Sequence, residues 1–217
     1  MKKMTKILSA FLLLGALAAC GGESSSQPSV ENPSQSEVSS VPAGETQTTL
    51  EESLVNIAVG KTCYLTTVGQ ADSDIVGNVF KKAGAVGSYT TETMLQASDV
   101  AEGSVVFLTL GASSKGLGQA GVDEAYEKNR AAEFASAAKD GKFTLILFHV
   151  GGTARRGASS DPIIEAAFPG AAACFVVSSG NEDGFFTTLS STHNVSLYSV
   201  SKSLELVDFA KGLFGQE

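Results

Sequence analysis

The chain has 217 residues, of which 43% are hydrophobic, and this length and composition suit one ordinary globular domain. Its formal net charge of −8 excludes a general attraction for nucleic acid or anionic lipid. We therefore expect no nucleic-acid partner, and any site for an anion must be local.

The N-terminus is typical of an export signal. A cluster of three lysines precedes an apolar run over 7–17 that is too short to span a bilayer as a stable helix. The segment 17–22, LAACGG, resembles the bacterial lipoprotein signal, in which the cysteine becomes the lipid-bearing first residue. This predicts a signal peptide over 1–19 and a Cys20 anchored in membrane lipid at the extracytoplasmic face. An ordinary cleaved signal with a chance cysteine is the alternative.

Residues 20–52 predict a tether. They are rich in Ser, Pro, Gln, Gly and Glu and nearly lack large apolar side chains. Such a segment cannot bury enough surface to offset its conformational entropy, so we expect it to be disordered. The folded domain is then expected over 53–217.

From residue 53 onward, apolar strands alternate with amphipathic helices. We expect strands at 63–68, 104–110, 143–150, 173–177 and 195–200, and helices at 72–83, 92–99, 123–139, 161–168, 185–192 and 203–214. Residues 143–148 are almost continuously apolar, as in a strand buried on both faces. The pattern predicts an α/β fold: one three-layer, doubly wound (Rossmann- or flavodoxin-like) domain with a mainly parallel sheet of five or six strands.

The cysteines after Cys20 predict packing rather than chemistry. Cys63 and Cys174 each lie inside an apolar run, where a thiol usually behaves as a small hydrophobe, although a disulfide between them stays open. No Cys/His spacing resembles a metal site, so none is expected.

Four loops should meet at the carboxyl edge of such a sheet, where doubly wound folds bind their ligands. These loops, at 68–74, 111–121, 151–157 and 178–184, are rich in Gly, Ser, Asn and Asp, whereas the opposite connections are shorter. Glycine lets the backbone approach a ligand, and cationic side chains attract an anion. The candidate ligand-binding residues are Ser113, Ser114, Lys115, Gly116, Gly151, Gly152, Arg155, Arg156 and Asn181. Alternatively, the arginines pair with acids such as Asp161 or Glu165.

Two residues are candidates for catalysis. His149 ends the central strand, where a general base could lie, and Ser114 is next to Lys115. The sequence assigns neither of them a partner. Segment 111–121 has neither P-loop spacing nor the dinucleotide fingerprint, so no cofactor is expected.

Three segments resemble an uncharacterised family of exported bacterial proteins, domain of unknown function 6305. They are GASSKGLGQAGVD at 111–123, HVGGTARRG at 149–157 and GNEDGFF at 180–186. The resemblance extends from about Cys63 to the C-terminus. It implies that these three loops form one signature, and it implies no chemistry.

The leading hypothesis is a membrane-anchored lipoprotein whose α/β domain binds a small anionic metabolite through the loops at the carboxyl edge. A hydrolase or transferase that uses His149 or Ser114 is one alternative. A module that docks a partner protein of the cell envelope is another.

Overall fold

A computed structural model describes residues 46–217. They form one seven-stranded sheet in which every neighbouring pair of strands is parallel, in the order β1-β7-β6-β5-β4-β2-β3. The strands are β1 Thr46–Gln47, β2 Cys63–Val68, β3 Thr90–Thr91, β4 Val105–Leu110, β5 Thr144–His149, β6 Ala173–Val177 and β7 Ser196–Val200.

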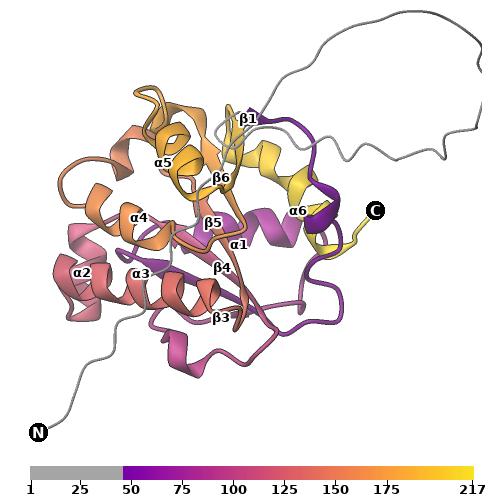
Figure 1. The fold of residues 1–217 in the computed structure, drawn as a ribbon, viewed down its shortest axis with the longest axis horizontal. Helices are drawn as coiled ribbons and strands as arrows, with labels where there is room; N and C mark the ends of the chain where they lie inside the picture. Colours follow the sequence, from indigo (N-terminus) through magenta and orange to yellow (C-terminus); the bar gives the residue numbers. More distant parts are fainter. Residues whose placement is uncertain (1–45) are drawn as a thin grey trace, which may run out of the picture. The chain divides into compact units, whose positions relative to one another are not determined.

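Helices cover both faces of the sheet, so the expected three-layer α/β fold is confirmed (Figure 1). They are α1 Ser73–Lys82, α2 Ser114–Ala120, α3 Glu124–Lys139, α4 Asp161–Ala167, α5 Phe185–His193 and α6 Leu206–Phe214. Helices α1 and α6 pack on one face, and α3, α4 and α5 contribute to the core on the other. Every residue of β4 is buried, as expected for a central strand between two helical layers.

The core beneath α1 and α6 is aromatic. The ring of Phe175 stacks on Phe148 at 5.0 Å and on Tyr198 at 4.6 Å, so one row of rings crosses three adjacent strands. Phe80 of α1 meets Phe107 of β4 edge-on at 4.9 Å. This packing fixes the strands whose carboxyl ends carry the loops considered below.

The structure differs from the sequence-based expectation in three elements. The sheet has seven strands rather than five or six, because the two-residue strands β1 and β3 lie at its edges. Such short strands leave no periodic pattern in the sequence. The helix expected over 92–99 is only a 3-10 turn at Ala97–Asp99. The glycine-rich segment 111–121, expected to be a loop, contains helix α2.

The fold begins before residue 53, because residues 46–61 form an N-terminal strap. Strand β1 pairs with β7, and the Glu51 carboxylate accepts a hydrogen bond from the Ser196 hydroxyl at 2.6 Å. The backbone N–H groups of Asn56 and Ala58 donate to the carbonyls of Gly212 and Leu213 at the end of α6. The strap thus satisfies carbonyls that a helix C-terminus leaves without partners. The expected signal peptide (1–19) and Cys20 lie outside the described residues.

Both cysteines of the described part of the chain are free and buried. Burial raises the pKa of the Cys63 thiol to about 11, and it also raises the pKa of Cys174. Both thiols are therefore uncharged packing groups at neutral pH. None of the helices in residues 46–217 is both long and apolar enough to cross a membrane.

The strap gives a first prediction, which concerns stability. A chain that starts at Ser53 lacks the β1–β7 pairing and the contacts of Leu50 and Glu51, so we expect it to unfold about 2 kcal/mol more easily than a chain that starts at Thr46. Urea denaturation of the two chains measures the difference. Equal midpoints for the chains that start at 46 and 53 would contradict the prediction.

Candidate functional site

The strand order places a switch point between β2 and β4. The chain leaves β2 for α1 on one face of the sheet, and it leaves β4 for α2 and α3 towards the other. Loops that diverge in this way open a crevice at the carboxyl edge, which is where doubly wound folds bind ligands. The loops after β5 and β6 end at the same edge.

The turn between β2 and α1 is conformationally strained. Gly69, Gln70 and Asp72 have φ values of 88°, 58° and 62°, in the left-handed region. For the two residues with side chains this costs about 1 kcal/mol or more each. Such a turn persists only where its surroundings hold it in place. We call residues 69–72 the switch-point turn.

A buried ion pair on α3 holds one side of this turn. The Glu127 carboxylate accepts hydrogen bonds from the Gly69 N–H and from the Gln70 side chain, both at 2.9 Å. It also pairs with Arg130 at 2.7 Å, and both side chains are almost completely buried. Arg130 in turn donates to the carbonyls of Leu95 and Thr67. The pair therefore links α3 to the end of β2 and to the turn after it.

Sequence reasoning missed this pair, although the sequence contains its signal. Glu127 and Arg130 stand at helical spacing with Ala131 and Phe134, both of which are completely buried. Two opposite charges within the buried stripe of a helix indicate a buried ion pair.

Hydroxyl groups hold the other side of the turn. The hydroxyls of Thr67 and Thr109 both donate to the Ala71 carbonyl, at 2.8 and 3.1 Å. The Ser113 N–H donates to the Gly69 carbonyl at 2.8 Å and so joins the loop after β4 to the same turn.

Arg155 connects the loops that follow β5, β4 and β2. It closes the 3-10 turn η3 (Gly152–Arg155) after β5, and its aliphatic chain lies against Gly111 after β4. Its Nε atom lies 3.2 Å from both carboxylate oxygens of Asp72 in the switch-point turn. The Asp72 side chain is 9% exposed and that of Arg155 is 31% exposed. No residue of 46–217 accepts a hydrogen bond from the Nη1 or Nη2 atoms of Arg155.

Arg156 lies among acidic partners instead. It pairs with Asp161 at 2.8 Å and with Asp183 at 3.0 Å, and it donates to the Gly180 carbonyl. Its guanidinium carbon lies 3.9 Å from the centre of the Phe185 ring. Burial acts to lower the pKa of Arg156, but the Asp161 and Asp183 carboxylates together outweigh it and raise that pKa. Arg156 in turn lowers the pKa of Asp183. Arg156 thus joins the loops after β5 and β6. Both arginines pair with acids, as the alternative expected: Arg156 with Asp161 and Asp183, and Arg155 with Asp72.

The three glycines predicted to bind a ligand allow the loops to pack closely against one another. A Cβ atom on Gly116 would lie 2.2 Å from the Gln70 carbonyl oxygen, and one on Gly151 would lie 2.0 Å from Arg155 Cγ. A Cβ atom on Gly152 would likewise lie 2.3 Å from the Ser179 Oγ atom. Real Cβ atoms are not found at such distances, so these positions require glycine for packing of the loops themselves.

The remaining predicted residues have separate environments. The Ser113 side chain caps α2 by accepting from the Gly116 N–H, and that of Asn181 caps α5 by accepting from the Phe186 N–H at 2.8 Å. Ser114 and Lys115 are exposed in the first turn of α2, and Lys115 forms no ion pair with the residues that the structure describes.

His149 is completely buried. Its Nδ1 atom lies 3.1 Å from the Leu110 carbonyl oxygen, and its Nε2 atom lies 3.1 Å from that of Gly152. Burial lowers its pKa, against smaller opposing effects of these two carbonyls. Because both ring nitrogens contact backbone and the side chain has no exposed surface, His149 is not available to an external substrate.

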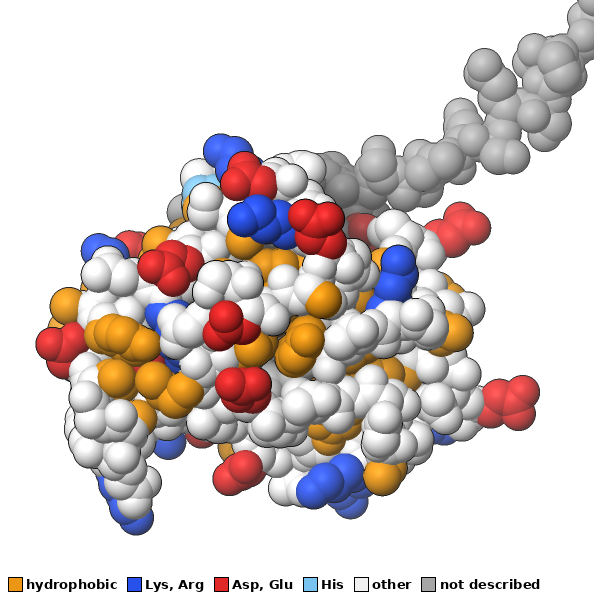
Figure 2. Space-filling view, turned by 90° about the horizontal axis from the view of Figure 1, so that it is seen from below, with side chains coloured by type: hydrophobic (Ala, Val, Ile, Leu, Met, Phe, Trp, Pro, Cys, Tyr) orange, Lys and Arg blue, Asp and Glu red, His pale blue; other side chains and the backbone are white. Residues whose placement is uncertain are grey.

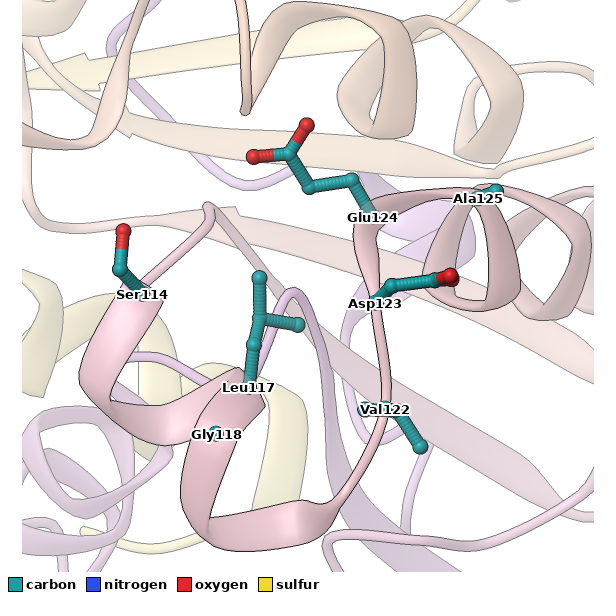
Figure 3. A pocket seen from close by; sticks show the side chains of 7 residues that line it. All are labelled: Ser114, Leu117, Gly118, Val122, Asp123, Glu124 and Ala125. Atoms are coloured by element: carbon teal, nitrogen blue, oxygen red, sulfur yellow. The ribbon is translucent and has the colours of Figure 1, made fainter.

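Two pockets lie near the loops. One, of about 470 Å³, is open and separates the start of α2 from the start of α3. Figure 3 shows Leu117 between Ser114 of α2 and Glu124 of α3 in this pocket. The other, of about 280 Å³, lies beside Arg156 and is bordered by Asp161 and Asp183.

Lys115, Arg155 and Asn181 do not line the pocket beside Arg156, so these four predicted residues do not share it. Among residues 46–217, no three His, Cys, Asp or Glu side chains are grouped so that they could hold a metal ion. Figure 2 shows basic and acidic side chains interspersed on the face in view, without a continuous basic surface.

The comparisons with known proteins give a family and no relative of known activity. The sequence profile described as "Domain of unknown function (DUF6305)" matches residues 61–214. No curated protein and no solved structure matches the chain.

The buried pair gives a second prediction. Glu127→Ala leaves the Arg130 charge without its partner and frees the strained turn, so we expect it to lower the free energy of unfolding by about 3–5 kcal/mol. Glu124→Ala, an exposed position on the same helix, is the matched control and should change stability by less than about 0.5 kcal/mol. Urea denaturation measures both. A loss below about 1 kcal/mol for Glu127→Ala would show that the pair does not hold the turn.

Proposed function

Because the chain belongs to the DUF6305 family, whose description assigns no function, we propose a function from geometry: the domain binds a small anionic ligand at the switch point between β2 and β4. Arg155 is the cation of this site, and a carboxylate or phosphate is the group that it recognises.

The orientation of Arg155 carries the proposal. Asp72 uses only the Nε atom of the guanidinium. The edge with Nη1 and Nη2 keeps its donors, and two parallel N–H groups match the two oxygens of a carboxylate or phosphate. Since Asp72 already holds the guanidinium in place, binding of a ligand would cost little conformational entropy of the Arg155 side chain.

Neighbouring groups support the same edge of the sheet. Lys115 follows the loop after β4, is exposed and has no acidic partner among the described residues. Gly116 allows α2 to approach the Gln70 carbonyl, which keeps the start of α2 close to the switch-point turn. We propose Lys115 as a second cation and the Ser114 hydroxyl as a donor. Arg156 and Asn181 would hold the loops in position without contacting the ligand.

A third prediction tests the role of Arg155. Arg155→Ala removes the guanidinium edge with Nη1 and Nη2. We expect it to weaken binding of an anion about tenfold or more, because a hydrogen bond to a charged group contributes about 1.5–3 kcal/mol. Isothermal calorimetry with phosphate, acetate and sulfate measures it. Lys142→Ala is the matched control, because it removes one exposed positive charge after α3, at the opposite edge of the sheet. Equal losses in the two variants would indicate a net-charge effect and contradict the site.

A second candidate function is docking of an envelope protein through an acidic group. It is favoured by one observation: the Arg155 side chain is 31% exposed and lines neither the pocket between α2 and α3 nor the pocket beside Arg156. Binding of free anions in calorimetry would favour the metabolite, whereas binding only of an acidic protein partner would favour docking. A hydrolase or transferase based on His149 has no support in the environment of that side chain.

We also propose that Cys20 anchors the protein in the membrane at its extracytoplasmic face. The support is the segment 17–22 within an export-type N-terminus. The acidic stretch between Cys20 and the strap would then separate the domain from an anionic lipid surface.

This location gives a fourth prediction. Cys20→Ala removes the acceptor of the lipid, so we expect the protein to move from the membrane fraction to the soluble extracytoplasmic fraction. Fractionation with immunoblotting measures the distribution, and mass spectrometry of the N-terminal peptide checks the lipid. Cys63→Ala is the control and should stay in the membrane fraction. Retention of the Cys20 variant on the membrane would overturn the proposed anchor.

A further inference from the structure

His149 has more acceptors around it than a neutral ring can serve. Its two ring nitrogens each lie 3.1 Å from a carbonyl oxygen, of Leu110 and of Gly152. A neutral imidazole carries one N–H, so one of these contacts then sets a nitrogen lone pair against an oxygen lone pair. Only the imidazolium donates to both carbonyls.

We propose that His149 is a proton-dependent latch that regulates the anion site. In the protonated state it ties the end of β4, through Leu110, to the first residue of turn η3, Gly152. Arg155 is the last residue of that turn. In the neutral state one carbonyl is released, and the turn that positions Arg155 is held less firmly. The latch stands on the geometry of His149, and its effect on the site rests on the proposed function.

The surroundings of His149 decide where the latch titrates. Two charged groups act on the ring: Asp72 of the switch-point turn favours the protonated form, and Arg156 disfavours it. The other elements packed against the ring contribute uncharged groups: α5 contributes the Phe186 ring at 4.8 Å, and η4 contributes Gly180. Burial outweighs the rest and lowers the pKa of His149, so the latch closes below the ordinary histidine range near pH 6.5.

Proton uptake and anion binding should favour each other. An imidazolium beneath the loops adds positive charge near Asp72, the carboxylate that holds Arg155, and it fixes the turn that ends at Arg155. By linkage, an anion bound at Arg155 must raise the pKa of His149 by the same coupling. The chain therefore binds anions more tightly in mildly acidic solution than at neutral pH.

The first part of the test needs no substitution. The chain contains two histidines, so the imidazole nitrogens of His149 can be separated by NMR from those of His193. We expect His149 to have one N–H at pH 8 and two N–H groups at pH 5, with parallel shifts of the Gly152 and Arg155 amides. A single neutral tautomer throughout this range, with or without sulfate, would overturn the latch.

The second part measures sulfate affinity between pH 5.5 and 7.5, because sulfate does not titrate there. We expect the dissociation constant to fall about threefold or more towards pH 5.5, a modest coupling for a charge close to the site. His149→Gln should lose this dependence and His193→Gln should keep it. Binding of sulfate that does not vary with pH would overturn the regulation alone. Absence of binding at every pH would overturn the proposed function, and the NMR titration would still decide on the latch.

Discussion

The carboxyl edge of this domain depends on one buried ion pair. Glu127 and Arg130 lie inside the layer of α3, where two isolated charges would be strongly unfavourable. Their cost is offset because each also satisfies backbone groups: the Gly69 N–H binds to Glu127, and the carbonyls of Leu95 and Thr67 bind to Arg130. The strained turn after β2 is thereby fixed relative to α3. Without that constraint a turn with two side-chain-bearing residues in the left-handed region would relax, and Asp72 could not reach Arg155.

Adjacent arginines in one loop have different environments because they follow different backbone conformations. Arg155 is the last residue of a 3-10 turn, and Arg156 is extended, with φ −118° and ψ 170°. Their side chains therefore leave the chain in different directions, one towards β4 and β2 and the other towards the loop after β6. Asp161 and Asp183 occupy the fork of Arg156 from two sides, whereas Asp72 occupies only the Nε atom of Arg155. A charge count of the loop would treat the two residues as equivalent.

Much of the fold follows from the sequence, because parallel strands buried on both faces leave long apolar runs and because helices between them repeat at 3.6 residues. The edge strands and the strap escape this reasoning, since β1 and β3 have two residues each and no period. Helix α2 was not predicted because Gly116 and Gly118 disfavour a helix. The cap at Ser113 and the contact of Gly116 with Gln70 outweigh that preference. The gathering of four glycine-rich loops at one edge could be predicted from topology alone. Which arginine keeps unpaired donor atoms could not be predicted, because pairing depends on side-chain directions across loops that are distant in sequence.

Asp72 has two opposing effects on the anion that we propose. Its negative charge near Arg155 weakens the attraction for any ligand of the same sign, so simple Coulomb attraction makes this a poor site. The same carboxylate fixes the guanidinium through Nε and turns its two-nitrogen edge outward, which favours ligands with two coplanar oxygens over monatomic anions of equal charge. Geometry rather than net charge would then determine selectivity. This also fits a chain with an overall negative charge, in which attraction at long range is absent and recognition must come from contact.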